Sequence, residues 1–481
     1  MSRFSLFFAL FLLFACEENE IPIPPPPAPV ENSGAVAVWR TNASGTLSMA
    51  KEPDSLAFQT PTTADVSFTI DPTQSFQPIE GFGAAMTGAS AFVLMEHLAK
   101  AERLALLEEL FSVEKGIGIS YLRLTIGASD FSTGNFSYND LSPGVTDTDM
   151  SEFSLAKEQT HLIPVLKEIL TIAPDLSIMA TPWTAPAWMK DNQNLISGGK
   201  LNSNFYDAYA LYFVKYLEAM AMEGIRIQAI TVQNEPLHQA TYPSMSMTSE
   251  EQKIFIRDHL GPAFTQANLS TQIIIYDHNW DEIQYPLDIL SDSTAKSMIH
   301  GSAFHCYAGE VRAMAQVHQA HPDRAIYFTE CSGGEWSPDF ASNLAWNMEN
   351  LMVGATRNWA RTVILWNLAL DENNGPQNGG CSDCRGVLTI NSTNNSVSKN
   401  VEFYLLAHMA KFVRPGALRI STPATRGQGI SQVAFQNLDG SIALIAFNHE
   451  NRSQKIQVQQ NEEAFLYEME AGMLASFSWM P

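Results

Sequence analysis

The sequence predicts a (β/α)8 barrel, an α/β fold of the TIM-barrel type, with an associated β-sandwich domain. Its 481 residues suit one large barrel plus a smaller module, and 45% of them are hydrophobic, which is enough for a sizeable core. Between residues 79 and about 370, eight short apolar runs alternate with segments of helical period. After residue 417 the pattern changes to short strands separated by Asn, Gly and Asp turns.

The alternating segments predict the barrel, because strands that alternate with helices form βαβ units and a parallel sheet. Eight such units favour a closed barrel over a doubly wound sheet, and no G-x-G-x-x-G follows the first run, which argues against a dinucleotide-binding fold. The expected strands are Ile79–Ala84, Ile119–Ile126, Leu176–Thr181, Ile227–Val232, Gln272–Tyr276, Ser302–His305, Ala325–Phe328 and Thr362–Trp366. The expected helices include Ala101–Phe111, Thr160–Thr171, Phe205–Met222, Ser249–Ala267, Val311–Ala320 and Pro338–Ala360.

The sandwich is predicted from both ends of the chain. Similar short strands occur near the start, at Val36–Trp39 and Val66–Ile70, and we expect residues 34–76 to join a C-terminal sandwich of residues 417–481. The catalytic barrel would then occupy residues 77–416. The later strands are expected at Ile430–Gln436, Ser441–Asn448, Lys455–Gln459, Ala464–Tyr467 and Ala475–Trp479.

Residues 1–16 are expected to form a lipoprotein signal peptide. The apolar stretch Phe4–Phe14 is too short to cross a ~30 Å hydrocarbon core and is typical of a secretory signal. The tetrapeptide Leu13-Phe14-Ala15-Cys16 resembles a bacterial lipobox, in which Cys16 would be lipidated after cleavage. The alternative is an ordinary signal peptide with an incidental cysteine.

Residues 17–33 are expected to form an acidic and proline-rich linker. Three glutamates within Glu17–Glu20 resemble a surface-export signal of Gram-negative lipoproteins, and Ile21–Val30 reads as a semi-rigid polyproline spacer. We therefore expect an exported bacterial lipoprotein of the outer membrane, exposed at the cell surface, with a periplasm-facing protein as the alternative. Its membrane contact would be the lipid at Cys16, and the protein is expected to be a monomer.

The net charge and the spacing of the cysteines limit which partners and cofactors are expected. The net charge of -23 repels phosphate backbones, so we expect no nucleic-acid partner. Besides Cys16, four cysteines remain, at positions 306, 331, 381 and 384. The Cys381 to Cys384 spacing favours a local disulfide in an oxidising compartment, since a zinc site would need two further ligands of similar kind nearby. No metal or organic cofactor is expected, because no H-E-x-x-H or EF-hand pattern occurs.

Polar and aromatic side chains collect at the ends of the predicted strands, where barrels of this kind carry their chemistry. Glu235 ends the fourth strand within Asn-Glu-Pro, and Glu330 ends the seventh. Two carboxyls suit glycoside cleavage, in which one protonates the leaving oxygen and the other meets an oxocarbenium-like carbon. The other strand ends carry Arg123, Asp130, Trp183, Asn234, His305, Tyr307 and Trp366.

Eight segments in this order resemble glycoside hydrolase family 30, which includes glucosylceramidases and microbial β-1,6-glucanases. They are IEGFGAAMTGASA (79–91), YLRLTIGASDFS (121–132), ATPWTAPAWMK (180–190), VQNEP (232–236), FHCY (304–307), FTECSGGEW (328–336), LWNLALDENNGP (365–376) and HMAKFVRPGALRI (408–420). The resemblance implies a retaining mechanism, with Glu330 as nucleophile and Glu235 as acid/base. The carboxyl groups should then lie ~5–5.5 Å apart, and the pKa of the acid should be raised by burial or by its anionic neighbour.

The resemblance also implies a set of substrate-binding residues. Arg123 would order the carboxylates, with an ion pair in the barrel floor as its alternative role. His305 and Tyr307 would lie near the nucleophile, with a satisfied buried histidine as the alternative for His305. The remaining matches are Trp183 and Trp366 lining the glycone pocket, Asn234 holding the 2-hydroxyl, Tyr242 near the leaving group, and Asp130 tying loops rather than contacting sugar.

One difference from the glucosylceramidase motif narrows the range of expected substrates. Glucosylceramidases read Gly-Ala-Met-Thr-Asp where this chain has Met86-Thr87-Gly88, and the resemblance assigns that Asp to the outer glucose hydroxyls. A retaining enzyme acting on β-linked glucan, with β-1,6 linkages favoured, is therefore the main hypothesis. The alternatives are an exo-acting β-glucosidase, β-xylosidase or β-fucosidase, a glucosylceramidase-like enzyme, and a non-catalytic surface glycan-binding lipoprotein.

Overall fold

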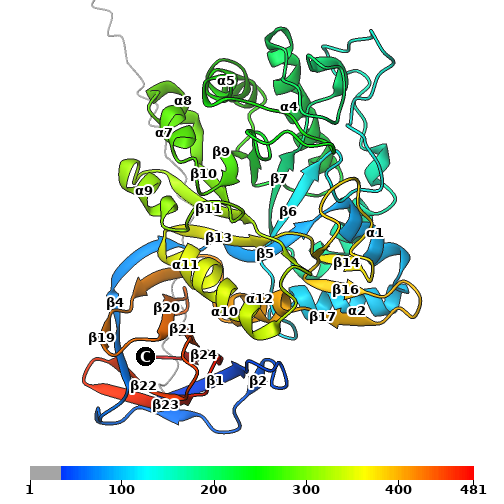
Figure 1. Cartoon of the computed structure of the whole chain (residues 1–481). Coiled ribbons are helices and arrows are strands. Elements are labelled where there is room, and N and C mark those ends of the chain that lie inside the picture. The colour runs from blue at the N-terminus through cyan, green and yellow to red at the C-terminus, as the bar shows by residue number, and fades with distance from the viewer. Residues whose placement is uncertain (1–33) are drawn as a thin grey trace, which may run out of the picture.

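The structure is a computed structural model that describes residues 34–481 (Figure 1). The predicted signal peptide with Cys16 and the whole predicted linker, residues 17–33, lie outside the described residues. Within the described part of the chain, no helix combines the length and apolarity needed to cross a bilayer.

The centre of the molecule is a closed barrel of eight parallel strands, as the sequence predicts. Around the barrel they are β5 (Gly81–Met86), β6 (Tyr121–Ile126), β7 (Ser177–Pro182), β8 (Ala229–Thr231), β9 (Gln272–Asn279), β10 (Ile299–His305), β11 (Ala325–Glu330) and β13 (Ala360–Leu365). Every predicted strand overlaps one of them. A separate cluster of buried side chains that includes Tyr121, Met179, Ile274, Tyr327 and Ile364 draws on strands from all round the barrel, so the barrel has a packed interior.

Helices surround the barrel and bury the outer face of its strands in a large apolar core. They are α1 (Gly88–Glu96), α2 (Lys100–Phe111), α3 (Leu162–Ile172), α4 (Tyr206–Met222), α5 (Ser249–Phe255), α6 (Gly261–Gln266), α7 (Gln284–Leu290), α8 (Ser293–Met298), α9 (Ala313–Ala320), α10 (Phe340–Asn347), α11 (Val353–Arg357) and α12 (Val401–Ala410). Short 3-10 turns are η1 (Ala156–Glu158), η2 (Ala187–Met189) and η3 (Ser203–Phe205), and π-helical segments are η4 (Ile256–Leu260) and η5 (Met348–Met352).

Two of the predicted helices differ in detail from the structure. Segment 249–266 is helical as expected but contains the π-helical segment η4. The helix expected over Pro338–Ala360 begins at Phe340 and ends at Arg357, so its predicted end was wrong. The reason is local: Trp359 adopts a left-handed φ of 76°, which stops the helix, and Ala360 already begins β13.

The β-sandwich lies beside the barrel and combines strands from both ends of the described chain (Figure 1). Strand β1 pairs with β24, and β4 pairs with β18, β19 and β22. Its strands are β1 (Ala35–Thr41), β2 (Ala50–Lys51), β3 (Leu56–Ala57), β4 (Val66–Pro78), β18 (Leu418–Ser421), β19 (Ala424–Arg426), β20 (Ile430–Gln436), β21 (Ile442–Asn448), β22 (Gln454–Gln460), β23 (Glu463–Met469) and β24 (Leu474–Trp479).

A buried histidine ties the two parts together. His408 on α12 hydrogen-bonds Thr41 of β1 at 2.9 Å through Nε2 and Ser476 of β24 at 2.7 Å through Nδ1. Burial lowers the pKa of His408 to about 3, so the ring is neutral and can donate one hydrogen bond and accept the other. The N-terminal and C-terminal strands of the sandwich are thereby fixed to the barrel.

Two small sheets form from the segments that follow β11 and β13 in the chain. One pairs β12 (Gly333–Gly334) with β15 (Cys384–Arg385), and the other contains β14 (Ala369–Asp371), β16 (Leu388–Ile390) and β17 (Val397–Lys399). Arg385 forms a buried ion pair with Glu402 at 2.9 Å, which anchors β15 to the start of α12. The loops after β11 and β13 are thus held beside the strand ends.

Candidate active site

A cavity of about 350 Å³ opens at the carboxyl-terminal end of the barrel. Five of the predicted catalytic or substrate-binding residues line it, and three others lie directly beneath. Of these three, Arg123 bonds Glu330, His305 bonds Glu235 and Asn234 bonds Arg123. The lining residues are Asp130, Glu235, His238, Tyr242, His278, Asn279, Tyr307, Glu330, Trp336, Trp366, Cys381 and Cys384. The residues beneath are Arg123, Asn234 and His305, each at most 6% exposed.

Glu330 is the last residue of β11, and both of its carboxylate oxygens receive hydrogen bonds. Arg123 donates from Nη1 to Oε2 at 2.5 Å, and the Tyr307 hydroxyl donates to Oε1 at 2.9 Å. Burial raises the pKa of Glu330, while His305 and Arg123 oppose that rise. The two donors fix the orientation of the carboxylate, which is what a nucleophile needs before it attacks an anomeric carbon.

Glu235 follows β8 in a strained conformation that turns its side chain toward Glu330. Its φ is 43°, in the left-handed region, and its N–H donates to the Asp277 carbonyl at 3.0 Å. Oxygens of Glu235 and Glu330 and a ring nitrogen of His305 all lie within 4.8 Å of one another. The separation fits the retaining class of glycosidases and is shorter than the ~6.5–9.5 Å of inverting enzymes.

Asp277, on β9, connects the charged groups beneath the cavity. It is fully buried and accepts hydrogen bonds from Arg123 at 2.9 Å, His305 at 3.0 Å, Thr231 at 2.6 Å and Thr329 at 2.7 Å. Burial alone would raise its pKa, but Arg123 and His305 hold the pKa well below the usual range. The sequence did not predict this residue. The feature of the sequence that could have indicated it is the polar run Asp277-His278-Asn279, which completes the fifth barrel strand.

His305 lies between two carboxylates. Its Nδ1 is 3.0 Å from Glu235 Oε1 and its Nε2 is 3.0 Å from Asp277 Oδ1. Burial alone would lower the pKa of His305, but Glu330, Asp277 and Glu235 raise it to about 9. The ring is fully buried and both of its nitrogens are paired, as in the alternative of a satisfied buried histidine, and one of the two partners is the candidate acid.

The raised pKa expected for Glu235 is wrong for the free enzyme. Burial raises the pKa, but the hydrogen bond and the charge of His305 outweigh burial and lower it. Glu235 and His305 share one proton along the 3.0 Å contact, which lies either on Nδ1 or on Oε1. The pair therefore stores a proton at neutral pH even though the Glu235 carboxylate is stabilised.

Two stacked indoles form one wall of the site. Trp366 lines the cavity and packs against Trp183, with ring centroids 5.2 Å apart and an angle of 21°. The Arg123 guanidinium lies 5.0 Å from the Trp183 ring and 5.5 Å from the Trp366 ring. Trp183 is 2% exposed and lies outside the lining residues of the described cavity. Of the two indoles expected to line the glycone pocket, Trp366 lines the cavity and Trp183 packs behind it.

Asp130 was expected to tie loops, and its backbone carbonyl accepts a hydrogen bond at 2.6 Å from the Asn378 N–H, in the loop between β14 and β15. Asp130 also lines the cavity, and its Oδ1 has no hydrogen-bond partner within residues 34–481. Burial, together with Glu330 and Glu235, raises its pKa well above the usual value. Gly88 faces Ser132 rather than the cavity, since a Cβ there would lie 3.3 Å from the Ser132 hydroxyl. Asp130 therefore offers an unpartnered carboxyl oxygen to the described cavity.

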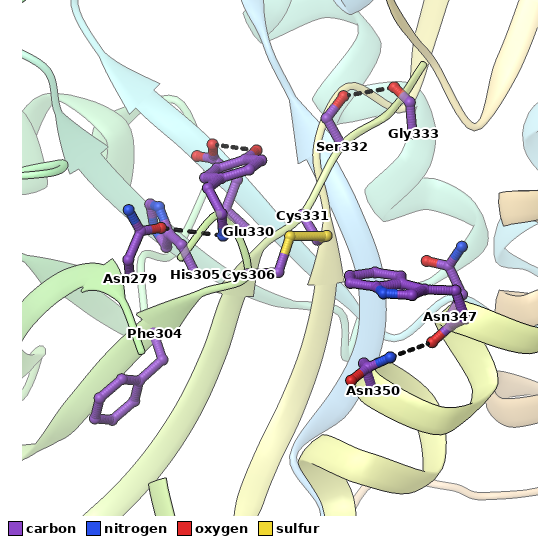
Figure 2. Close-up of a disulfide and its surroundings, with 12 residues drawn as sticks. Asn279, Phe304, His305, Cys306, Glu330, Cys331, Ser332, Gly333, Asn347 and Asn350 are labelled. Atoms are coloured by element: carbon purple, nitrogen blue, oxygen red, sulfur yellow. Dashed lines mark hydrogen bonds between the residues drawn. A yellow bond between two sulfur atoms is a disulfide. The ribbon is translucent and has the colours of Figure 1, made fainter. Parts of the chain in front are cut away.

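Two disulfides border the site. Cys381 joins Cys384, and both line the cavity. Cys306 joins Cys331, a pairing that the sequence did not predict (Figure 2). Cys306 directly follows His305, and Cys331 directly follows Glu330. Trp336, which is 55% exposed at the cavity mouth, was also not predicted. It stands six residues after Glu330.

Glu235, His305 and Glu330 are close enough together to contact a single cation. Their facing atoms are already paired, however. Both oxygens of Glu330 accept hydrogen bonds, and His305 Nδ1 faces Glu235. The arrangement thus fits proton transfer and nucleophilic attack without rearrangement.

Two family descriptions match the chain. "Glycosyl hydrolase family 30 TIM-barrel domain" matches residues 79–413, and "Glycosyl hydrolase family 30 beta sandwich domain" matches residues 416–476. The chain belongs to glycosyl hydrolase family 30. It is a glycoside hydrolase, and the family's barrel and sandwich are those described above.

Individual relatives agree with this assignment. The endo-1,6-β-D-glucanase of Neurospora crassa is 35% identical over 399 residues, which cover 79% of this chain and 81% of the relative. The lysosomal acid glucosylceramidase of Mus musculus is 29% identical over 434 residues, covering 84% of this chain and 81% of the relative. The solved structure of the endo-β1,6-glucanase BT3312 superposes with a TM-score of 0.87 at 36% identity, covering 93% of this chain and all of that one.

Proposed function

We propose that this hydrolase cleaves β-1,6-glucan internally, with retention of configuration, through Glu330 as nucleophile and Glu235 as acid/base. The observation that carries the mechanism is the approach of the two carboxylates to within 4.8 Å over one cavity. The similarity to proteins named as endo-1,6-β-glucanases supports the substrate.

In the first step Glu330 attacks the anomeric carbon while the glycosidic bond breaks. Arg123 and Tyr307 hold the attacking carboxylate in place. Glu235 gives the leaving oxygen a proton drawn from the pair that it forms with His305. A glycosyl ester of Glu330 forms, and the negative charge of that residue disappears.

In the second step water replaces the leaving group. Glu235, now a carboxylate, removes a proton from this water, which attacks the anomeric carbon and releases Glu330. Because the Glu330 ester carries no negative charge, Glu235 is a better-stabilised anion at this stage. His305 beside it is neutral, since the pair has given its shared proton to the leaving oxygen, and the proton taken from water restores the pair. Asp277 keeps His305 in the required orientation throughout through its contact with Nε2.

The cavity offers matching groups for a glucosyl unit. Trp366 presents an aromatic wall, and Asp130 supplies an unpartnered carboxyl oxygen within the described cavity. Asn234 directly precedes Glu235, and its amide oxygen accepts a hydrogen bond from Arg123. We assign Asn234 to the 2-hydroxyl and Asp130 to the hydroxyls farther round the ring. Trp336, Tyr242 and the Cys381–Cys384 loop form the side that would receive the leaving sugar.

A substrate panel tests the proposal. Pustulan, laminarin, galactan, xylan and aryl β-glycosides are incubated with the enzyme, and products are resolved over time. We expect pustulan to be cleaved first into a range of oligosaccharides, as endo action requires. Release of glucose alone would indicate an exo-acting β-glucosidase. Pustulan hydrolysis that persists in both Glu235→Gln and Glu330→Gln would contradict the proposed site, and binding of glycan without any hydrolysis would favour the non-catalytic lipoprotein.

We also propose that the enzyme is exported and held at the outer membrane through a lipid on Cys16, as a monomer. The lipobox-like Leu13–Cys16 supports export, and so do two disulfides, which form in oxidising compartments. Cys16→Ala should release the protein from the membrane fraction and abolish labelling by a radioactive fatty acid. Protease treatment of intact cells distinguishes the cell surface from the periplasm.

A further inference from the structure

The disulfide between Cys306 and Cys331 lies where two catalytic strands stop pairing. Strands β10 and β11 run in parallel register up to Phe304, the register then shifts, and the last paired residues are His305 and Glu330. The next residue of each strand is a cysteine, with Cα atoms 5.4 Å apart. A covalent bond therefore continues the connection just beyond the point at which the backbone ladder ends (Figure 2).

Tyr307, the residue after Cys306, depends on this connection. Its side chain is 45% exposed, yet its hydroxyl must stay 2.9 Å from Glu330 Oε1. Its backbone is held by the N–H bond to Asn279 Oδ1 at 3.1 Å and by the neighbouring disulfide. A half-exposed side chain gains little from packing, so the placement of its backbone decides whether the hydroxyl reaches the carboxylate.

The other end of the disulfide is also tied to the site. The Cys331 carbonyl accepts a hydrogen bond from the Trp366 N–H at 2.9 Å. Cys331 is 3% exposed and directly follows Glu330. The bond thus links the backbone positions of Tyr307, Glu330 and Trp366, which contribute a hydrogen-bond donor, the nucleophile and the aromatic wall.

We propose that the Cys306–Cys331 disulfide is a positioning element of the active site, which holds Tyr307 against Glu330 and makes turnover depend on the oxidised state of this pair. The inference rests on the proposed role of Glu330 as nucleophile. Hydrogen bonding by Tyr307 favours the ionised carboxylate. When the disulfide is lost, the Tyr307–Glu330 contact loosens, the pKa of Glu330 rises further and formation of the glycosyl ester slows.

A double-mutant cycle on β-1,6-glucan hydrolysis tests whether the disulfide acts through Tyr307. The four proteins are the wild type, Tyr307→Phe, Cys306→Ala/Cys331→Ala and the triple variant, all assayed well below their melting temperatures. We expect Tyr307→Phe to lower kcat/KM about 10- to 100-fold in the wild type, the loss typical of a hydrogen bond to a charged group. In the disulfide-free protein the same change should cost less than about threefold.

The pH profile adds a readout that a purely stabilising disulfide would leave unchanged. The acidic limb of kcat/KM should move to higher pH in Tyr307→Phe and in Cys306→Ala/Cys331→Ala alike. Fully additive losses in the cycle, with an unshifted acidic limb in the cysteine variant, would overturn the proposal. Wild-type protein that does not cleave β-1,6-glucan would instead refute the proposed substrate, which separates the two failures.

Reduction of a folded protein provides an independent test. In Cys381→Ser/Cys384→Ser, the pair at 306 and 331 is the remaining disulfide of the described residues. A phosphine reductant converts it to two thiols and, with one water, becomes a phosphine oxide. We expect kcat to fall in proportion to the thiols that appear and to recover on reoxidation. Unchanged kcat after both new thiols have been titrated would contradict the proposal.

Discussion

Replacing Asp277 by Asn should move the basic limb of the pH–rate profile. Asp277 is fully buried and bonds His305 Nε2 at 3.0 Å, and it is one of the anions that raise the pKa of His305 to about 9. Asn keeps the shape and can still accept the hydrogen bond, but it removes the negative charge. His305 is protonated below its pKa, so a lower pKa makes the Glu235–His305 pair lose its proton at lower pH.

The size of the shift follows from the lost interaction. A hydrogen bond to a charged group contributes about 1.5–3 kcal/mol, and each pKa unit corresponds to about 1.4 kcal/mol. The pKa of His305 should therefore fall by about 1–2 units, to between about 7 and 8. At pH 8 the wild type should remain mostly active, whereas Asp277→Asn should have lost between about half and about nine-tenths of its kcat/KM.

The assay is kcat/KM for β-1,6-glucan between pH 4 and 10, with melting curves to show that each variant is folded. Thr329→Val is the matched control, because Thr329 donates to the same carboxylate oxygen at 2.7 Å but carries no charge. It should shift the basic limb by less than about half a unit, because the negative charge of Asp277, which raises the pKa of His305, is still present. An unmoved basic limb in Asp277→Asn would show that the Glu235–His305 pair does not supply the proton.

Three further outcomes are expected. With an activated aryl β-glycoside and azide, Glu235→Ala should yield the β-glycosyl azide, and Glu330→Ala should yield the α-glycosyl azide. The reason is that azide attacks from the face of the sugar that the removed glutamate leaves open. The opposite products would exchange the roles of the two glutamates. Trp366→Leu should raise KM about tenfold with a smaller change in kcat, as loss of an aromatic contact worth about 1.4 kcal/mol predicts; an unchanged KM would remove Trp366 from the substrate site. Burial raises the pKa of Glu158 to about 7, although Tyr138 donates a hydrogen bond to its carboxyl group, so ionisation of Glu158 should destabilise the fold as pH rises through 7. Glu158→Gln should therefore gain up to about 3 kcal/mol in unfolding free energy at pH 8.5 and much less at pH 5. Equal gains at both pH values would contradict the shift.

The fold could be predicted because its signals are local and repeated. Each barrel strand is a short apolar run, and each sandwich strand is bounded by turn residues, so the segments are visible one at a time. The end of the helix expected at Ala360 was missed because the left-handed residue Trp359 carries no sequence signal of the kind that glycine gives. Boundaries of that sort depend on tertiary packing.

The site could be predicted only in part. Glu235 and Glu330 stand in recognisable motifs at strand ends, so they could be predicted from the sequence, and the structure brings them together. Asp277 was missed because one buried aspartate on a strand has no spacing rule, and its role appears only when Arg123 and His305 surround it. The pairing of Cys306 with Cys331 likewise depends on two barrel strands lying side by side, which only the folded structure shows.

The most direct test of the two-carboxylate account is covalent trapping. An activated 2-deoxy-2-fluoro-β-glucoside slows both steps but hydrolysis of the ester more, so the intermediate accumulates and can be located by peptide mass spectrometry. The account predicts one sugar per chain, on the peptide that contains Glu330, and no label in Glu330→Gln. A label on Glu235, or inactivation with the sugar on neither glutamate, would contradict it.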